Sequence, residues 1–346
     1  MVHKASICTM SLGRCFAGHS MEHKLDMARK YGFEGIEVFY EDLLDLAGND
    51  SAVTAQLSAA RSLRHMCNSR GLEIICLQPF MHYGGEVNRE LHKQRIEEFH
   101  IWTKLAHILG TDLVVLPSSF LPASQISEDL NLIVDDLKEV ADIALRQSPP
   151  LRVAYEALSW GTRIDTWEGS WDMVQKVDSP NFGICFDSFN IAGRIYADPA
   201  SYTGTTVDAD DAVARSVERL LSVVDPEKIF VVQVADAERL SSPLVKGHDF
   251  YNAEQPCRMS WSRNCRLLYG EGYLPCREIL DAIVNSLHYD GYLSFEVFNR
   301  RLADRDGTVP EEMASRGARS WKKMVEDLSL ITSKSTTAEH DIQARL

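Results

Sequence analysis

The sequence predicts a (β/α)8 barrel, the TIM-barrel fold, and three observations lead to this fold class. Eight short runs are almost continuously apolar, as parallel strands covered on both faces are. Most of these runs are followed by a longer amphipathic stretch with helix start and stop signals. No glycine-rich phosphate turn follows any run, which weighs against the alternative, an open doubly wound sheet.

The eight predicted strands share a short length and a high content of β-branched and aromatic residues. Parallel strands of this kind close into a barrel when helices separate them. In chain order, the strands are predicted at Ala5–Met10, Gly35–Phe39, Leu72–Leu77, Asp112–Leu116, Arg152–Tyr155, Phe182–Phe186, Ile229–Val234 and Tyr292–Val297.

The predicted helices are marked by capping residues at their starts and, in three cases, by a glycine after their ends. Ser20 caps the first, Asp50 or Ser51 the second, and Asp129 lies in the first turn of the fourth. In order, the helices are predicted at Ser20–Tyr31, 50–70, Asn88–Leu109, Ser127–Gln147, Trp167–Val177, Asp211–Val224, Arg277–Leu287 and Glu311–Leu328.

Composition excludes several classes of protein. Lys and Arg number 36 against 50 Asp and Glu, and the resulting net charge of −14 argues against binding of nucleic acid. No stretch of ~18 apolar residues occurs, so we expect no membrane span. The eight cysteines form no CxxC pair, and the N-terminus lacks a signal-peptide pattern. We therefore expect a reduced, cytoplasmic protein.

Residues 1–330 are expected to form a single catalytic domain, and residues 331–346 a polar C-terminal tail. The segment between the seventh and eighth strands is unusually long. Because the loops after barrel strands line the catalytic face, residues 237–276 are expected to form a wall or lid there. The oligomeric state stays open, with a homo-oligomer among the alternatives.

Carboxylate and amide side chains stand at the ends of several predicted strands, where a barrel brings them together at one mouth. Glu37 ends the second strand. Glu156, Asp187, Gln233 and Glu296 belong to strands five to eight. These four oxygen ligands can surround one divalent cation, and hard oxygen ligands favour Mg²⁺ or Mn²⁺, with Co²⁺ as a substitute. For any single residue, the alternative is a hydrogen bond to a neighbouring loop.

The long seventh loop carries a cluster of positive charge. Arg258, Arg263 and Arg266 lie within nine residues, with Ser262 among them. A guanidinium matches the geometry of a carboxylate, so the cluster favours an anionic, carboxylated substrate. The alternative interpretation is a solvated basic loop.

Several motifs together resemble the xylose isomerase-like, sugar phosphate isomerase/epimerase superfamily over roughly residues 1–330. They are FEGIEVFYED, YEALSWGT, GICFDSFN, VVQVAD, RLLYGEGYLP and GYLSFEVF. Two longer stretches, ICFDSFNIAGRIYADP and FYNAEQPCRMSWSRNCRLLYGEGYLP, are similar to the fungal 3-dehydroshikimate dehydratases of quinate catabolism.

This resemblance implies a TIM barrel with a metal held by the four ligands above. It also implies metal-dependent dehydration of 3-dehydroshikimate, a small carboxylated ring, to protocatechuate and water through an enolate. Ser262 and Arg266 match the serine and arginine that the family places before the Gly-Glu-Gly segment. Arg266 is therefore counted with the catalytic residues and Ser262 with the substrate-binding residues.

The general base is the open part of the prediction. His82 follows the third strand and is our candidate, with Glu37 and Tyr83 as orienting groups. Arg163, Asn190, Arg258 and Arg263 are further candidates for substrate contact. Relatives often carry histidines where this chain has Leu158 and Asn190, so the base cannot be transferred from them.

Three other functions compete. A ketose or sugar-acid isomerase or epimerase would use the same metal site, and the arginine-rich loop argues for a carboxylated substrate instead. A DNA-repair endonuclease of the related barrel family would need a histidine-rich zinc cluster and a basic face. A non-catalytic barrel would be expected to have lost a ligand, and all four positions are filled.

Overall fold

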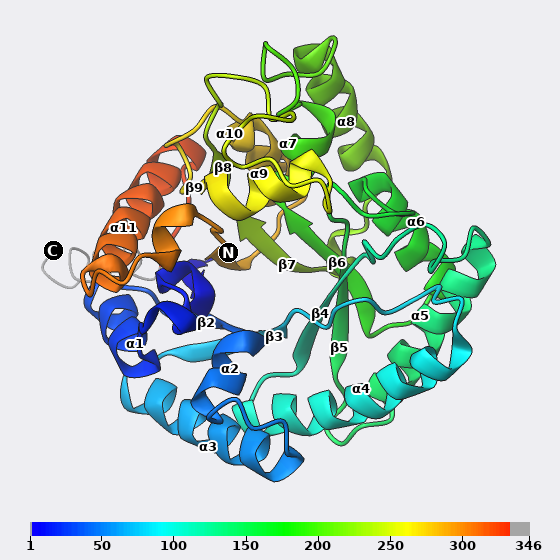
Figure 1. The fold of residues 1–346 in the computed structure, drawn as a ribbon, viewed down its shortest axis with the longest axis vertical. Coiled ribbons are helices and arrows are strands. Elements are labelled where there is room, and N and C mark those ends of the chain that lie inside the picture. The colour runs from blue at the N-terminus through cyan, green and yellow to red at the C-terminus, as the bar shows by residue number, and fades with distance from the viewer. Residues whose placement is uncertain (1, 333–346) are drawn as a thin grey trace, which may run out of the picture.

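Eight parallel strands close into a barrel in the computed structural model, which describes residues 2–332. Going around the barrel, the strand order is β1-β10-β7-β6-β5-β4-β3-β2, so the predicted fold class is confirmed (Figure 1). The barrel strands are β1 (His3–Cys8), β2 (Gly35–Phe39), β3 (Glu73–Gln78), β4 (Leu113–Pro117), β5 (Arg152–Glu156), β6 (Phe182–Asp187), β7 (Ile229–Val234) and β10 (Gly291–Phe295).

Helices form a ring around the outside of the barrel (Figure 1). Their apolar faces pack on the strands, which explains why the strand sequences are apolar on both faces. The α-helices are α1 (Met21–Lys30), α2 (Tyr40–Leu46), α3 (Val53–Ser69), α4 (Arg89–Leu109), α5 (Leu130–Leu145), α6 (Trp167–Val177), α7 (Ser188–Ile195), α8 (Ala209–Val223), α9 (Cys257–Cys265), α10 (Cys276–Asp281) and α11 (Val309–Leu328).

All eight predicted strands are present, two of them (β2 and β7) with the predicted bounds. The largest difference is at β1, which ends at Cys8 because the next residues, Thr9–Leu12, turn into a short 3₁₀ helix.

Some predicted helix ends are wrong. The second helix begins at Val53 after Ala52, because the Asp50 carboxylate accepts a hydrogen bond from the Ala52 N–H and ends the loop there. Asp129 is the N-cap of α5 and accepts from the Asn131 N–H, so that helix starts at Leu130 instead of Ser127. Past α10 the chain continues as a π-helical turn over Ala282–Ser286.

Three short helices were not predicted: α2, α7 and α9. Two of them, α2 and α7, begin directly at the end of a strand, and α9 lies within the long loop after β7. Asp187 starts α7, because its Oδ1 accepts a hydrogen bond of 2.8 Å from the Phe189 N–H. The other carboxylate oxygen, Oδ2, accepts hydrogen bonds from Asn190 and Arg266.

The barrel interior contains an apolar cluster of side chains from five adjacent strands: Cys76, Leu113, Val115, Ala154, Cys185 and Val231. Side chains of a strand alternate between its two faces, so the residue two positions later points into the barrel again. The next layer toward the mouth is therefore made by Gln78, Pro117, Glu156, Asp187 and Gln233. The alternation of the strands thus places the polar residues above an apolar floor.

The long loop of residues 237–276 is ordered by Asp236. Its carboxylate accepts hydrogen bonds from the backbone N–H groups of Ala237, Gly272 and Leu274. Gly272 packs so closely that a Cβ atom there would lie 2.2 Å from the Ala237 carbonyl oxygen. A two-stranded antiparallel sheet, β8 (Asp236–Ala237) with β9 (Arg266–Leu267), closes the loop, and α9 crosses in front of β6 and β7 (Figure 1).

At the other end of the molecule, Thr332 pairs with His3 beside β1. Of the predicted polar tail, residues 333–346 lie outside the described residues. Among residues 2–332, no helix is long and apolar enough to cross a membrane.

Candidate active site

Three carboxylates from three strands meet at the mouth of the barrel. Glu156 ends β5, Asp187 ends β6, and Glu296 directly follows β10. One oxygen from each lies within 4.8 Å of the others, and all three side chains are buried. We call Glu156, Asp187 and Glu296 the carboxylate cage.

One buried cation, Arg266, faces this cage. Its Nη1 donates to Asp187 Oδ2 at 2.8 Å and to Glu296 Oε2 at 3.1 Å, while its Nε donates to Ser262 Oγ at 3.0 Å. The guanidinium also lies over the ring of Phe189, with 4.2 Å between Cζ and the ring centroid. Arg266 is therefore held in one position by charge, hydrogen bonds and packing.

Amide side chains complete the surroundings of the cage. Asn190 Nδ2 donates to Glu156 Oε1 at 2.7 Å and to Asp187 Oδ2 at 2.8 Å. Gln78 Nε2 donates to Glu296 Oε1 at 2.8 Å and to Glu37 Oε2 at 3.0 Å. These donors stabilise ionised carboxylates, but an amide adds no charge.

Gln233 lies beside Asp187 in the register of β6 and β7. Its Nε2 donates to Glu37 Oε2 at 2.8 Å, and its Oε1 accepts from the Cys185 thiol at 3.4 Å. Glu37 is fully buried one layer below the cage. It thus orients the amides of Gln78 and Gln233 and does not itself line the cavity.

Burial dominates the electrostatics of the cage. It raises the pKa of Glu156 well above its usual range, and the neighbouring charges of Glu296 and Asp187 raise it further. Burial also raises the pKa of Glu296 to about 7, although Arg266 acts in the opposite direction. The pKa of Asp187 is likewise raised by burial and lowered by Arg266. The single positive charge of Arg266 therefore does not balance the charges of three buried carboxylates.

The residues present fit a divalent cation. With all three carboxylates ionised, the cage and Arg266 together carry −3 + 1 = −2. A buried excess of two negative charges is costly unless a cation balances it. The atoms of the cage that can bind a metal are all oxygen atoms, which suits Mg²⁺ or Mn²⁺.

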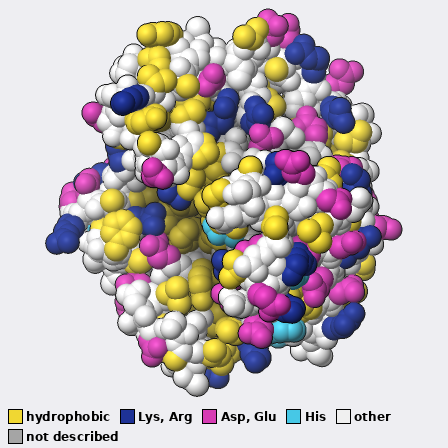
Figure 2. Space-filling view, turned by 45° about the vertical axis from the view of Figure 1, so that its right-hand side comes forward, with side chains coloured by type: hydrophobic (Ala, Val, Ile, Leu, Met, Phe, Trp, Pro, Cys, Tyr) yellow, Lys and Arg dark blue, Asp and Glu magenta, His cyan; other side chains and the backbone are white. Residues whose placement is uncertain are grey.

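Above the cage lies a cavity of about 460 Å³. Its walls are mainly apolar and aromatic, and the face shown in Figure 2 is hollowed at its centre with hydrophobic side chains along the hollow. Glu156, Glu296, Ser262 and Arg266 reach the floor of the cavity. The remaining lining residues are Arg14, Phe16, Phe39, Gln78, Pro79, Met81, Pro117, Phe120, Leu158, Trp160, Arg263 and Phe298.

The predicted base, His82, does not line this cavity. It packs edge-on against Phe120, with 4.5 Å between ring centroids, and its Nδ1 has no hydrogen-bond partner among the described residues. Burial and the charge of Arg95 lower the pKa of His82 to about 4, so its imidazole is neutral at pH 7. Tyr83, the next residue, is buried and donates to the Asp136 carbonyl.

Two of the predicted substrate-binding arginines hold loops and helix ends. Arg163 donates to the carbonyls of Ala123, Ile126 and Ser127. Arg258 donates to the Gly193 and Ala197 carbonyls at the end of α7. Neither lines the cavity, whereas Ser262, Arg263 and Arg266 from the same predicted set do.

Sequence reasoning missed several wall residues, including Arg14, Met81, Phe120, Trp160 and Phe298. Each follows a barrel strand by only a few residues, at the end where the loops form the mouth. This position was the available signal, because loops after strands line the mouth in a barrel. It does not tell which of a loop's side chains points inward.

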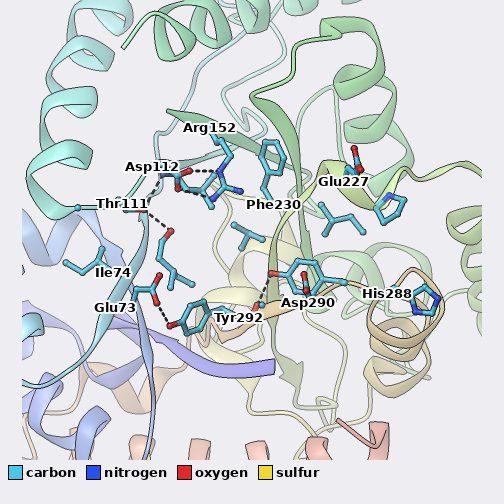
Figure 3. Close-up of a pocket in the computed structure, with 18 residues that line it drawn as sticks. Glu73, Ile74, Thr111, Asp112, Arg152, Glu227, Phe230, His288, Asp290 and Tyr292 are labelled. Carbon is cyan, nitrogen blue, oxygen red and sulfur yellow. Dashed lines mark hydrogen bonds and ion pairs between the residues drawn. The ribbon is translucent and has the colours of Figure 1, made fainter. Parts of the chain in front are cut away.

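A second cavity, of about 520 Å³, lies at the opposite end of the barrel, where the strands start (Figure 3). Two pairs of its polar side chains are joined by hydrogen bonds. Arg152 makes two hydrogen bonds to Asp112, at 2.8 and 2.9 Å, and Tyr292 donates to Glu73 at 2.6 Å. This end of a barrel serves stability, and the chemistry is expected at the mouth.

Comparison of the sequence with known proteins gives a consistent picture. The profile of the family described as "Xylose isomerase-like TIM barrel" matches residues 25–324. A 3-dehydroshikimate dehydratase of Neurospora crassa is 54% identical, over 95% of this chain and 96% of that protein. A 3-dehydroshikimate dehydratase of Pseudomonas aeruginosa is 33% identical over 85% of this chain, which spans 38% of that longer protein.

Comparison of the structure with solved structures agrees. A xylose isomerase-like TIM barrel/4-hydroxyphenylpyruvate dioxygenase fusion protein superposes with a TM-score of 0.72 and 28% sequence identity. The match covers 95% of this chain and 43% of the fusion protein.

Proposed function

The chain belongs to the xylose isomerase-like TIM barrel family, and on that premise we propose that it is a hydro-lyase that dehydrates 3-dehydroshikimate to protocatechuate and water. The carboxylate cage at the floor of a cavity with arginines in its wall is the observation that carries this proposal. The high identity to a dehydratase over nearly the whole of both chains supports it.

Glu156, Asp187 and Glu296, with Gln233 as a fourth ligand, would hold one Mg²⁺ or Mn²⁺ ion, for which Co²⁺ can substitute. When bound, such a cation supplies a Lewis acid that polarises the ring carbonyl of the substrate. Asn190 and Gln78 orient the carboxylate oxygens through the hydrogen bonds described above.

The residues of the chain supply the rest of the chemistry. The apolar walls, with Phe39, Phe120, Trp160 and Phe298, exclude water from the reacting ring. Dehydration beside a carbonyl also needs a group that takes a proton from carbon and a group that gives one to the departing hydroxyl. Glu156 and Glu296 are the carboxylates that line the cavity, and this position lets either of them exchange a proton with the ring.

His82 as the base stays a prediction. Its neutral imidazole can accept a proton, but it packs against Phe120, which lines the cavity, and does not line the cavity itself. The position on the cavity wall favours Glu156 or Glu296 for this role.

Turnover by purified protein tests the function. The protein is treated with a chelator, reloaded with Mg²⁺ or Mn²⁺, and mixed with 3-dehydroshikimate while ultraviolet absorbance follows the aromatic product. We expect the reloaded protein to form the aromatic product from 3-dehydroshikimate. We expect no product when the same protein is given a neutral ketose. Absence of product from protein shown to contain metal would contradict the proposed reaction.

The substrate partner is thus a small carboxylated ring. We also propose that the enzyme works in the reducing cytoplasm, which the eight free cysteines of the described chain support.

A further inference from the structure

Two arginines line the cavity but make no hydrogen bond to the cage. Arg14 lies in the loop after β1, and Arg263 lies in α9, in the loop after β7. In the barrel order β1-β10-β7, these loops flank the end of β10, which Phe298 follows. Arg14 and Arg263 therefore approach the cavity from two sides, and we call them the rim pair.

The rim pair carries a net positive charge, because only Arg14 has a carboxylate partner. Arg263 is exposed, its one hydrogen bond goes to a neutral group, Gln255 Oε1 at 2.7 Å, and no described carboxylate lies within ion-pair distance. Arg14 has one carboxylate partner, Glu41, at 2.6 Å from its Nη2. The Nε of Arg14 is buried and has no partner in the described part of the chain.

The two positive charges of the rim pair repel each other. Partial burial and the nearby charge of Arg14 both lower the pKa of Arg263. Two like charges beside one apolar cavity are unfavourable unless an anion lies between or next to them. The aromatic rings of Phe39 and Phe298, packed at 5.8 Å between centroids, form the adjacent wall.

Arg266 is the competing candidate for the substrate carboxylate, but most of its charge is already used. Its Nη1 and Nε contact Asp187, Glu296 and Ser262, and its role in the cage is to offset buried negative charge. Only its Nη2 has no partner among the described residues. A substrate carboxylate at Arg266 would also lie next to two buried carboxylates, which repel it.

We propose that the rim pair, Arg14 with Arg263, binds the ring carboxylate of the substrate, so that the reacting carbons point toward the cage. This inference rests on the proposed function and deepens it. The ligand class is a six-membered ring with a single carboxylate. Glu41 serves as a positioning residue, because it fixes the Arg14 guanidinium at the rim.

Two probes separate the carboxylate from the rest of the ring. Protocatechuate, the proposed product, and catechol differ only in the carboxylate. Their dissociation constants are measured by calorimetry on the Mg²⁺-loaded enzyme, for wild type, Arg14→Gln and Arg263→Gln. Arg146→Gln, which removes the same charge from an exposed ion pair with Asp142 outside the cavity, is the matched control.

We expect the wild type and Arg146→Gln to prefer protocatechuate over catechol. In Arg14→Gln and Arg263→Gln, protocatechuate binding should weaken about 10- to 100-fold, the range of a charge-assisted hydrogen bond, while catechol binding stays unchanged. The KM for 3-dehydroshikimate should rise in parallel, with a much smaller change in kcat. Arg263→Lys should restore part of the preference because it keeps the charge.

Other results would overturn the inference. An unchanged preference for protocatechuate in both rim variants would refute the rim pair, and loss of the preference in Arg266→Lys would assign the carboxylate to Arg266. If either result occurred while the wild type turned over 3-dehydroshikimate normally, only the rim pair would be wrong and the proposed function would stand. If wild type bound neither probe and made no product, the proposed function would fail with it. Melting temperatures of all variants show that each is folded.

Discussion

Glu156 and Glu296 are carboxylates buried at places where ionised side chains are costly without a counter-ion. Both are on the cavity floor, and both have a raised pKa because of burial. In isolation each would be a destabilising residue. Their placement in one cage is understandable if a divalent cation binds there and balances their charges.

Replacing either ligand tests this at the residue scale. Glu156→Gln and Glu296→Gln keep the side-chain volume but remove one negative charge from the cage. We expect bound metal, measured by elemental analysis, to fall far below one per chain, and kcat/KM to fall by more than about 100-fold. Glu254→Gln, an exposed residue of the long loop, is the control and should behave as wild type.

His82 gives a second residue-scale prediction, concerning pH. The folded-state pKa of His82 is lowered to about 4, whereas an unfolded histidine titrates near pH 6.5. Between these values the unfolded chain binds the extra proton, so the free energy of unfolding decreases as pH falls from about 6.5 to about 4. His82→Gln should flatten this part of the profile in urea unfolding, and His65→Gln, exposed on α3, should not.

The same variant tests the role of His82 in catalysis. Since His82 lies off the cavity wall, we expect His82→Gln to retain most of the wild-type kcat/KM across neutral pH. A loss of about 100-fold or more, the size expected for a general base, would instead establish His82 as the base and require Phe120 to move.

At the scale of elements, the loop between β3 and α4 is anchored from outside the barrel. The Asp136 carboxylate on α5 accepts hydrogen bonds from the Gly85 N–H at 2.8 Å and from Arg89 Nη1 at 2.9 Å. The same loop carries Pro79 and Met81, which line the cavity. One buried carboxylate on a neighbouring helix thus shapes part of the substrate pocket.

Asp136→Asn should loosen this loop without touching the cage. Loss of charge-assisted hydrogen bonds is expected to lower the free energy of unfolding by about 1.5–3 kcal/mol. Amide hydrogen exchange over residues 79–88 should become faster, while exchange in β5 and β6 stays slow. Asp135→Asn, on the exposed face of the same helix, serves as the control. Unchanged exchange in the loop would show that Asp136 does not anchor it.

The sequence predicted the strands well and the mouth loops poorly, for a physical reason. Strands are visible as apolar runs because both of their faces are buried. In α2 and α7, by contrast, the helix begins directly at a strand end, so no separate apolar period marks it. Asp187 illustrates this, since one carboxylate both caps α7 and joins the cage.

The candidate site was also predictable only in part. The strand-end carboxylates follow from the alternation along parallel strands, which a sequence reveals. Contacts such as Arg266 with Asp187 or Arg14 with Glu41 join distant parts of the chain, and only the closed barrel brings them together. For this reason the arginines of the long loop could be listed in advance but not sorted into Arg258, which holds α7, and Arg263, which faces the cavity.

At the scale of the whole molecule, the net charge of −14 is a poor guide to the site. The cage takes up three of the acidic residues, and the cavity wall carries the positive charges of Arg14 and Arg263. An acidic protein can therefore receive an anionic substrate, because the nearby charges dominate where screening by salt is weak.

Metal binding should also stabilise the whole fold. A ligand that binds only the folded state adds about 2.7 kcal/mol at a concentration 100 times its dissociation constant. We expect urea unfolding of the wild type to shift to higher urea when Mg²⁺ or Mn²⁺ is added and to return with a chelator. Glu156→Gln should show no such shift, since its cage lacks a ligand. Equal unfolding midpoints with and without metal in the wild type would argue against a structural link between cage and cation.

The central claim is that a cation held by the carboxylate cage is required for dehydration of 3-dehydroshikimate. The most direct measurement titrates Mn²⁺ into chelator-treated enzyme and records bound Mn²⁺ by electron paramagnetic resonance and protocatechuate formation in the same sample. The account predicts that activity rises in proportion to bound Mn²⁺, reaches its plateau at one ion per chain, and stays absent in Glu296→Gln. Turnover at the full rate by metal-free wild type would contradict it.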